Sequence, residues 1–246
     1  MMLTPTDAPA LPLWIGGRAY LTMAPAFRDL QAADGQVLRR VPLCGADEVA
    51  VAVDGARLTL ATWSAADVES RRGCVAAVAD GLERYTGHFA KLLMEETGRD
   101  EAAAQAEVAA TIAGLRALPA PHVAPRLVAA ITDNRAPLLA PALLAGAALA
   151  AGAVVVLKPS PLAPSCALAV AELFTRGGLP DGACNLVQGD EAAVAGLCVH
   201  PRVDVLAFAG DAATAAKVQT LAGQRPLLAL APEASLAPTL LAALQG

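Results

Sequence analysis

Aromatic side chains are scarce in this sequence, and positive charge does not outweigh negative charge. Phe, Trp and Tyr make up 3% of the 246 residues, whereas 56% are hydrophobic, so the apolar content is mostly Ala, Leu and Val. Small side chains of this kind suit helices packed closely on a sheet. The formal net charge is −5, and binding along a nucleic acid needs a basic field. The composition therefore argues against nucleic acid as a main partner.

The sequence also lacks the cysteine and histidine spacing of a disulfide framework or a zinc site. Its three histidines are scattered, its cysteines are odd in number, and no CxxC is present. This usage is typical of reduced thiols in a cytoplasmic protein, and we expect no bound metal. The N-terminus has no basic region followed by an apolar core, so it does not resemble a signal peptide. The cysteines are Cys44, Cys74, Cys166, Cys184 and Cys198.

One uncharged run, at 136–157, has about the length of a membrane span. Two prolines interrupt its start, and its character changes at Gly152. Residues 138–151 are helix formers, whereas 154–156 are three valines, as in a strand that is buried on both faces. We therefore interpret the run as a helix, a turn and a strand, with a membrane span as the weaker alternative.

The same alternation of strand and helix continues to the end of the chain and predicts a parallel sheet covered by helices. Ligands of such sheets bind beyond the carboxyl ends of strands, near helix N-termini. Lys158 directly follows the valine strand, so it is either a ligand-binding residue or a solvated lysine at a strand end. Strands are expected at 128–131, 184–189, 203–208 and 227–231, and helices at 164–176, 191–199 and 212–222.

The N-terminal half has a different pattern, and a proline-rich stretch at 119–125 joins it to the alternating region. We expect one domain over 1–246, with a helical N-terminal segment at 1–120 and the alternating region at 126–246. The initial Met and the apolar helix at the end are those expected of a complete chain. Helices of the N-terminal segment are expected at 47–63, 68–98 and 99–118.

Several motifs, in order along the chain, resemble the aldehyde dehydrogenase superfamily. The resemblance implies a Rossmann-like α/β fold, with the parallel sheet of that family's NAD-binding domain behind a helical N-terminal segment and with the catalytic domain absent. The motifs are WIGGR, AADGQVLRRVP, EETGRD (95–100), ALAAGAVVVLKPSP (148–161), GGLPDGACNLVQG (177–189) and HPRVDVLAFAGD (200–211).

In that family the lysine of KPS contacts the adenosine ribose of NAD(P), and an FTGS turn opens a helix that faces the pyrophosphate. The glutamate that helps to choose between NAD and NADP is replaced here by Pro161, and the serine of the turn by Asp211. Aspartate is a good N-cap, but its charge repels a pyrophosphate. We therefore expect NAD or NADP binding to be weak or lost. The implied cofactor-binding residues are Lys158, Ser160, Gly189, Phe208 and Gly210.

The family's chemistry needs a cysteine thiolate, a glutamate base and an oxyanion-hole asparagine. In the family the cysteine follows the glutamate at a distance that lies beyond the end of this chain, so no nucleophile is expected. The segment ITDNRAP (131–137) matches the asparagine motif, and Glu233 lies near the expected place of the glutamate. Asn134 or Arg135 at the oxyanion and Glu233 as the base are thus weak catalytic candidates, each with an ordinary loop residue as the alternative.

The shortened, cysteine-less chain resembles the non-catalytic second module of two-module aldehyde dehydrogenases. The resemblance implies a non-catalytic subunit that assembles with a full-length aldehyde dehydrogenase through the apolar surface left by the missing domain. One alternative is a residual NAD(P)-binding module that uses Lys158, or an oxidoreductase that acts with a partner's catalytic residues. Another is an independent oxidoreductase with an unrecognised nucleophile. No membrane partner is expected.

Overall fold

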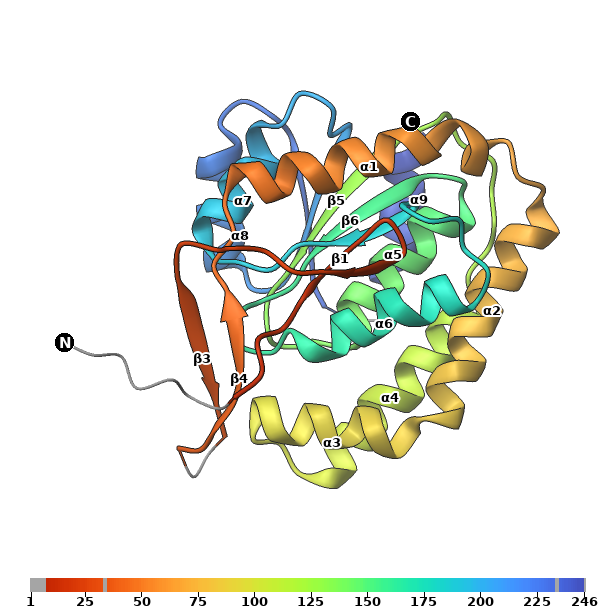
Figure 1. Cartoon of the computed structure of the whole chain (residues 1–246). Helices are drawn as coiled ribbons and strands as arrows, with labels where there is room; N and C mark the ends of the chain where they lie inside the picture. The colour runs from red at the N-terminus through yellow and green to blue at the C-terminus, as the bar shows by residue number, and fades with distance from the viewer. Residues whose placement is uncertain (1–7, 33–34, 233–234, 246) are drawn as a thin grey trace.

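The computed structural model describes residues 8–32, 35–232 and 235–245. Its centre is an α/β arrangement in which parallel strands lie side by side under helices (Figure 1). The predicted fold class is thereby confirmed. The parallel strands, in chain order, are β5 (Leu127–Thr132), β6 (Val154–Lys158), β7 (Cys184–Leu186), β8 (Val205–Ala209) and β9 (Leu227–Leu230).

The uncharged run divides into a helix and a strand, as predicted. Helix α5 (Leu139–Ala150) is buried along its whole length, and Gly152, with φ of +87°, forms the turn that follows it. Strand β6 is buried at every position because it lies between β5 and β7 and is covered on both faces. Within the described residues, no helix is both long enough and apolar enough to cross a membrane. The apolar run therefore forms part of the hydrophobic core.

Helices lie on both faces of the sheet (Figure 1). On one face, α1 packs against β5, β6 and β7 and beside α7, which in turn packs beside α8. On the other face, α5 packs beside α6 and α9. The bounds of these helices are α1 (Ala46–Ser64), α6 (Ser165–Arg176), α7 (Glu191–Val199), α8 (Ala212–Ala222) and α9 (Leu236–Gln245).

The N-terminal half contributes strands to the same sheet, which the sequence did not indicate. Strand β1 (Leu13–Ile15) pairs antiparallel with β7, and β2 (Arg18–Tyr20) pairs with β1, which gives the order β2-β1-β7-β6-β5-β8-β9. Strands β3 (Phe27–Gln31) and β4 (Val37–Pro42) form a separate hairpin. The sheet is therefore mostly, but not wholly, parallel.

Three predicted boundaries need correction. The helix expected at 68–98 is two helices, because Tyr85 has non-helical φ and ψ and is followed by Thr and Gly, which are poor helix formers. The strand expected at 184–189 ends at Leu186, and the strand expected at 203–208 begins only at Val205. The two helices that replace the one expected at 68–98 are followed by a third; the three are α2 (Val68–Arg84), α3 (Thr86–Thr97) and α4 (Glu101–Arg116).

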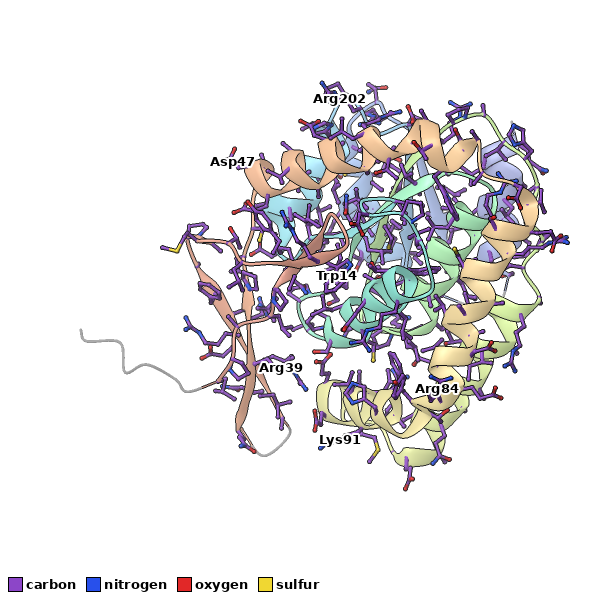
Figure 2. The ribbon with its side chains drawn as sticks, turned by 45° about the vertical axis from the view of Figure 1, so that its right-hand side comes forward. Trp14, Arg39, Asp47, Arg84, Lys91 and Arg202 are labelled. Atoms are coloured by element: carbon purple, nitrogen blue, oxygen red, sulfur yellow. The ribbon has the colours of Figure 1, made fainter. Side chains whose placement is uncertain are left out.

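Polar contacts fix the N-terminal strands to the helices. Arg39 of β4 extends toward α3 (Figure 2), where its guanidinium lies 3.3 Å from Glu95 and 3.4 Å from Glu96. The indole nitrogen of Trp14 in β1 donates a hydrogen bond of 3.0 Å to the Thr175 hydroxyl of α6. These contacts tie the hairpin to α3 and the edge of the sheet to α6.

Candidate functional site

The order of the parallel strands reverses beside β5, and a cavity lies at that point. The chain adds β6 and β7 on one side of β5 and then β8 and β9 on the other. Neighbouring connections therefore leave in opposite directions and open a crevice at the carboxyl ends of the strands, where open α/β sheets bind ligands. A cavity of about 510 Å³ occupies this position, between the ends of β5, β6 and β8, the first turn of α7 and one side of α8.

Lys158 lies on the inner surface of this cavity. It is the last residue of β6 and is only 3% exposed, so the alternative of a solvated strand-end lysine is wrong. Its ammonium donates a 3.0 Å hydrogen bond to the carbonyl of its neighbour Pro159, and among the described residues no carboxylate lies within ion-pair distance. Burial lowers the pKa of Lys158 to about 8, against the opposing effect of Asp190. Most of the amine still carries its charge at neutral pH.

Two further residues predicted to bind the cofactor, Phe208 and Ser160, line the same cavity, and so does Thr132. Phe208 is 1% exposed and forms part of the apolar wall. The Ser160 hydroxyl accepts a 3.3 Å hydrogen bond from the Leu162 amide and so fixes the turn after β6. Thr132, at the end of β5, was not singled out from the sequence, yet its hydroxyl is buried and has no hydrogen-bond partner.

The two glycines predicted to bind the cofactor, Gly189 and Gly210, do not line the cavity, although the residues that follow them do. Any side chain at Gly210 would collide with Asp133 and with the ring of Phe208. Gly189 has φ of +136°, and a Cβ there would lie 3.0 Å from the Cys44 carbonyl oxygen. Both positions therefore need glycine for close packing. Ligand contact at either glycine stays a prediction.

Asp211 occupies the N-terminus of α8. Its carboxylate accepts 2.9 Å hydrogen bonds from both the amide and the hydroxyl of Thr214, which confirms the predicted capping role. These bonds from Thr214, together with nearby Arg135, lower the pKa of Asp211, so it is ionised at neutral pH. The Asp211 amide is also taken, since it donates a 2.9 Å hydrogen bond to Asp133. The helix terminus therefore holds two carboxylates where it would otherwise offer N–H groups to an anion.

The structure describes two of the three weak catalytic candidates, Arg135 and Asn134. Arg135 is exposed, and its guanidinium forms ion pairs with Asp133 at 3.5 Å and with Asp211 at 3.7 Å. Asn134 is exposed at the rim of the cavity. Glu233 lies outside the described residues. Their proposed roles in catalysis stay predictions.

Among the ionisable side chains that line the cavity, acidic ones outnumber basic ones, and of the acidic ones the sequence singled out only Asp211. Asp190 caps α7, accepting a 3.3 Å hydrogen bond from the Ala192 amide, and Glu191 follows it. Their position at the start of a helix, directly after a strand, was the available signal. The residues at both helix starts do not fit the charge of a pyrophosphate. In the described chain, the ionisable lining residues are Asp133, Asp190, Glu191 and Asp211 on the acidic side, and Lys158 and Lys217 on the basic side.

The five cysteines are all buried, and none lines the cavity. Burial raises the pKa of Cys44 and of Cys184 to about 12, with Glu48 adding to the effect at Cys44. Burial also raises the pKa of each of the remaining thiols. Since the thiolate is the nucleophilic form, none of these side chains is prepared for attack at neutral pH. Cys166, Cys184 and Cys198 lie in the hydrophobic core.

Comparison with known proteins finds similarity to aldehyde dehydrogenases. The model of the aldehyde dehydrogenase family matches residues 22–120 and 125–234. A betaine aldehyde dehydrogenase of Vibrio vulnificus is 29% identical over 232 residues, which cover 83% of this chain and 47% of the relative. The structure of a succinate-semialdehyde dehydrogenase from Burkholderia pseudomallei has a TM-score of 0.80 and 28% identity, over 89% of this chain and 50% of that one. PnpE in complex with nicotinamide adenine dinucleotide has a TM-score of 0.81 and 26% identity, over 89% and 50%. The chain thus spans about half the length of these relatives.

Proposed function

Because this chain belongs to the aldehyde dehydrogenase family, we propose that it is a non-catalytic subunit that assembles with a full-length, NAD(P)-dependent aldehyde dehydrogenase. The observation that supports the proposal best is the burial of all five thiols away from the cavity. Aldehyde oxidation through a covalent intermediate needs an accessible thiolate. The five free cysteines also favour the reducing cytoplasm as its location.

We further propose that NAD(P) binding by the chain is weak or lost. Lys158 and Phe208 line the cavity in a way compatible with the adenosine part of a dinucleotide. Asp133 and Asp211 instead place two carboxylates at the helix start where a pyrophosphate would need N–H donors. A phosphate there would be repelled at short range by these two charges.

We propose that the full-length enzyme docks at the free edge of β9. The apolar face of α5 is covered, because α9 packs on it with Leu240 and Leu241 buried. In the part of the chain that the structure describes, no strand pairs with the outer edge of β9. Leu227 and Leu228 are half-buried and Ala229 is exposed along this edge. An open, apolar strand edge is a template for pairing with another chain.

Co-purification tests this assignment. A tagged chain, co-expressed with a full-length aldehyde dehydrogenase from the same cell, should retain that enzyme on the affinity column. Ala229→Lys should reduce the retained enzyme by about tenfold, because an edge lysine opposes strand pairing. Ala109→Lys, at an exposed position on α4, is the matched control and should retain as much enzyme as the unmodified chain.

Two results would contradict the proposal. One is a chain that purifies as a monomer and neither binds the full-length enzyme nor alters its activity. The other is equal retention by the Ala229→Lys and Ala109→Lys variants, which would remove the β9 edge as the docking surface.

A further inference from the structure

We propose that two copies of this chain associate through the outer edge of β2, antiparallel and about a two-fold axis, so that their sheets join into one. The inference goes beyond the proposed function, because β2 and β9 form opposite edges of the sheet. It follows from three features of β2: its exposure, the direction of its free backbone groups, and the match between its own side chains across a two-fold axis.

Strand β2 is an open edge of the sheet. All three of its residues, Arg18–Tyr20, are exposed, and within the described part of the chain only β1 pairs with it. In the segment that follows, Leu21 is 80% exposed and Met23 is 99% exposed. Free backbone groups beside exposed apolar side chains form a template for pairing with another strand.

The turn between β1 and β2 determines which backbone groups of β2 point outward. The glycines at 16–17 have φ of +62° and +72° and form a two-residue turn between Ile15 and Arg18, which are paired. In such a hairpin the two residues that flank the turn exchange hydrogen bonds, and the next pair, Trp14 with Ala19, does not. The amide and the carbonyl of Ala19 therefore point toward the open edge, where an antiparallel strand can bind them.

Pairing centred on Ala19 makes β2 complementary to itself. Two copies related by a two-fold axis would exchange both backbone hydrogen bonds between their Ala19 residues. Arg18 of each copy would then lie directly opposite the partner's Tyr20, in the kind of pair whose side chains approach most closely. A guanidinium group over a tyrosine ring is attractive, and the symmetry forms this contact twice.

Arg18 and Tyr20 are available for this contact. Within the described residues, neither side chain has a hydrogen bond or an ion pair. Both lie on the face of the sheet that carries Leu13 and Ile15, because Tyr20 pairs with Leu13 and Arg18 with Ile15. Slipping the two strands by two residues would instead place Arg18 opposite the partner's Arg18, and like charges oppose that register. The charge of Arg18 therefore discourages other pairings and favours an aromatic residue opposite it.

Analytical ultracentrifugation of the whole chain over a dilution series tests this inference. We expect a dimer of the 24.8 kDa chain that dissociates on dilution. Tyr20→Arg should weaken the dimer at least about tenfold, because it places arginine opposite Arg18 in both contacts. The double variant Arg18→Tyr with Tyr20→Arg exchanges the two residues and restores both contacts, so it should dimerise as tightly as the unmodified chain.

Tyr85→Arg is the matched control. Tyr85 is 44% exposed, as against 36% for Tyr20, but it lies between α2 and α3. Its replacement adds the same charge to the chain at a position outside the sheet, so it should leave the dissociation constant of the dimer unchanged.

The inference is overturned if the chain stays monomeric at every concentration, if Tyr20→Arg weakens the dimer no more than Tyr85→Arg, or if the exchanged double variant does not restore it. A dimer that is lost with Ala229→Lys and kept with Tyr20→Arg would lie at β9 and would also overturn it. Retention of the full-length enzyme is measured separately by co-purification, so loss of the β2 dimer leaves that proposal standing.

Discussion

Replacing Glu107 by Ala should lower the free energy of unfolding by about 3–5 kcal/mol, the usual cost of removing one partner from a buried ion pair. Glu107 is buried in α4, and its carboxylate accepts hydrogen bonds of 2.9 and 3.0 Å from the Leu138 and Leu139 amides. It also pairs with Arg99. Helix α5 has no side-chain cap of its own, so Glu107 supplies the cap from another helix.

Chemical denaturation measures this loss. Glu101→Ala, at an exposed position of the same helix, is the control and should change stability by only about 0.5 kcal/mol. Glu107→Gln should lie between the two, because the amide oxygen still accepts from the α5 amides but no longer balances the charge of Arg99. A loss below about 1 kcal/mol for Glu107→Ala would show that the α5 N-terminus does not depend on this carboxylate.

Replacing Leu240 by Ala should destabilise the chain by about 2–5 kcal/mol. Leu240 is 0% exposed and lies in α9, which packs on the buried helix α5. Truncation leaves a cavity between the two helices and weakens the cover over α5. Thr239→Ala, at the neighbouring exposed position, should change stability by about 0.5 kcal/mol or less when both variants are compared by thermal and chemical unfolding.

The contrast between the Leu240 and Thr239 variants tests whether α9 is part of the fold. Equal effects would mean that α9 does not pack on α5, and the apolar face of α5 would then become available as a docking surface. The predicted large difference supports the assignment of docking to the β9 edge, since it leaves α5 covered.

Much of the alternating region could be predicted because its elements are defined by local pattern. The run 136–157 changes from helix formers to valines at Gly152, and the structure divides it there. The addition of β1 to the sheet could not be predicted in the same way. It depends on the pairing of Trp14 with Leu186, residues far apart in the sequence and in strands of three residues each.

The site was only partly predictable for the same reason. Lys158 follows a buried strand, and that position alone indicated the carboxyl edge of the sheet. Its burial, the contact between Asp133 and Asp211, and the cap that Glu107 gives to α5 all depend on distant segments meeting in space. Sequence periodicity reports which face of an element is buried, but it does not report which charged side chains meet across elements.

The chain keeps the scaffold of the family's cofactor domain without a thiol prepared for catalysis. Thiol labelling of the native chain at neutral pH tests this claim most directly. We expect none of the five cysteines to react during a period in which all five react in denaturant, because burial raises each pKa and blocks access. A thiol that reacts as rapidly in the native chain as in the unfolded one, and more slowly when an aldehyde is present, would contradict the account.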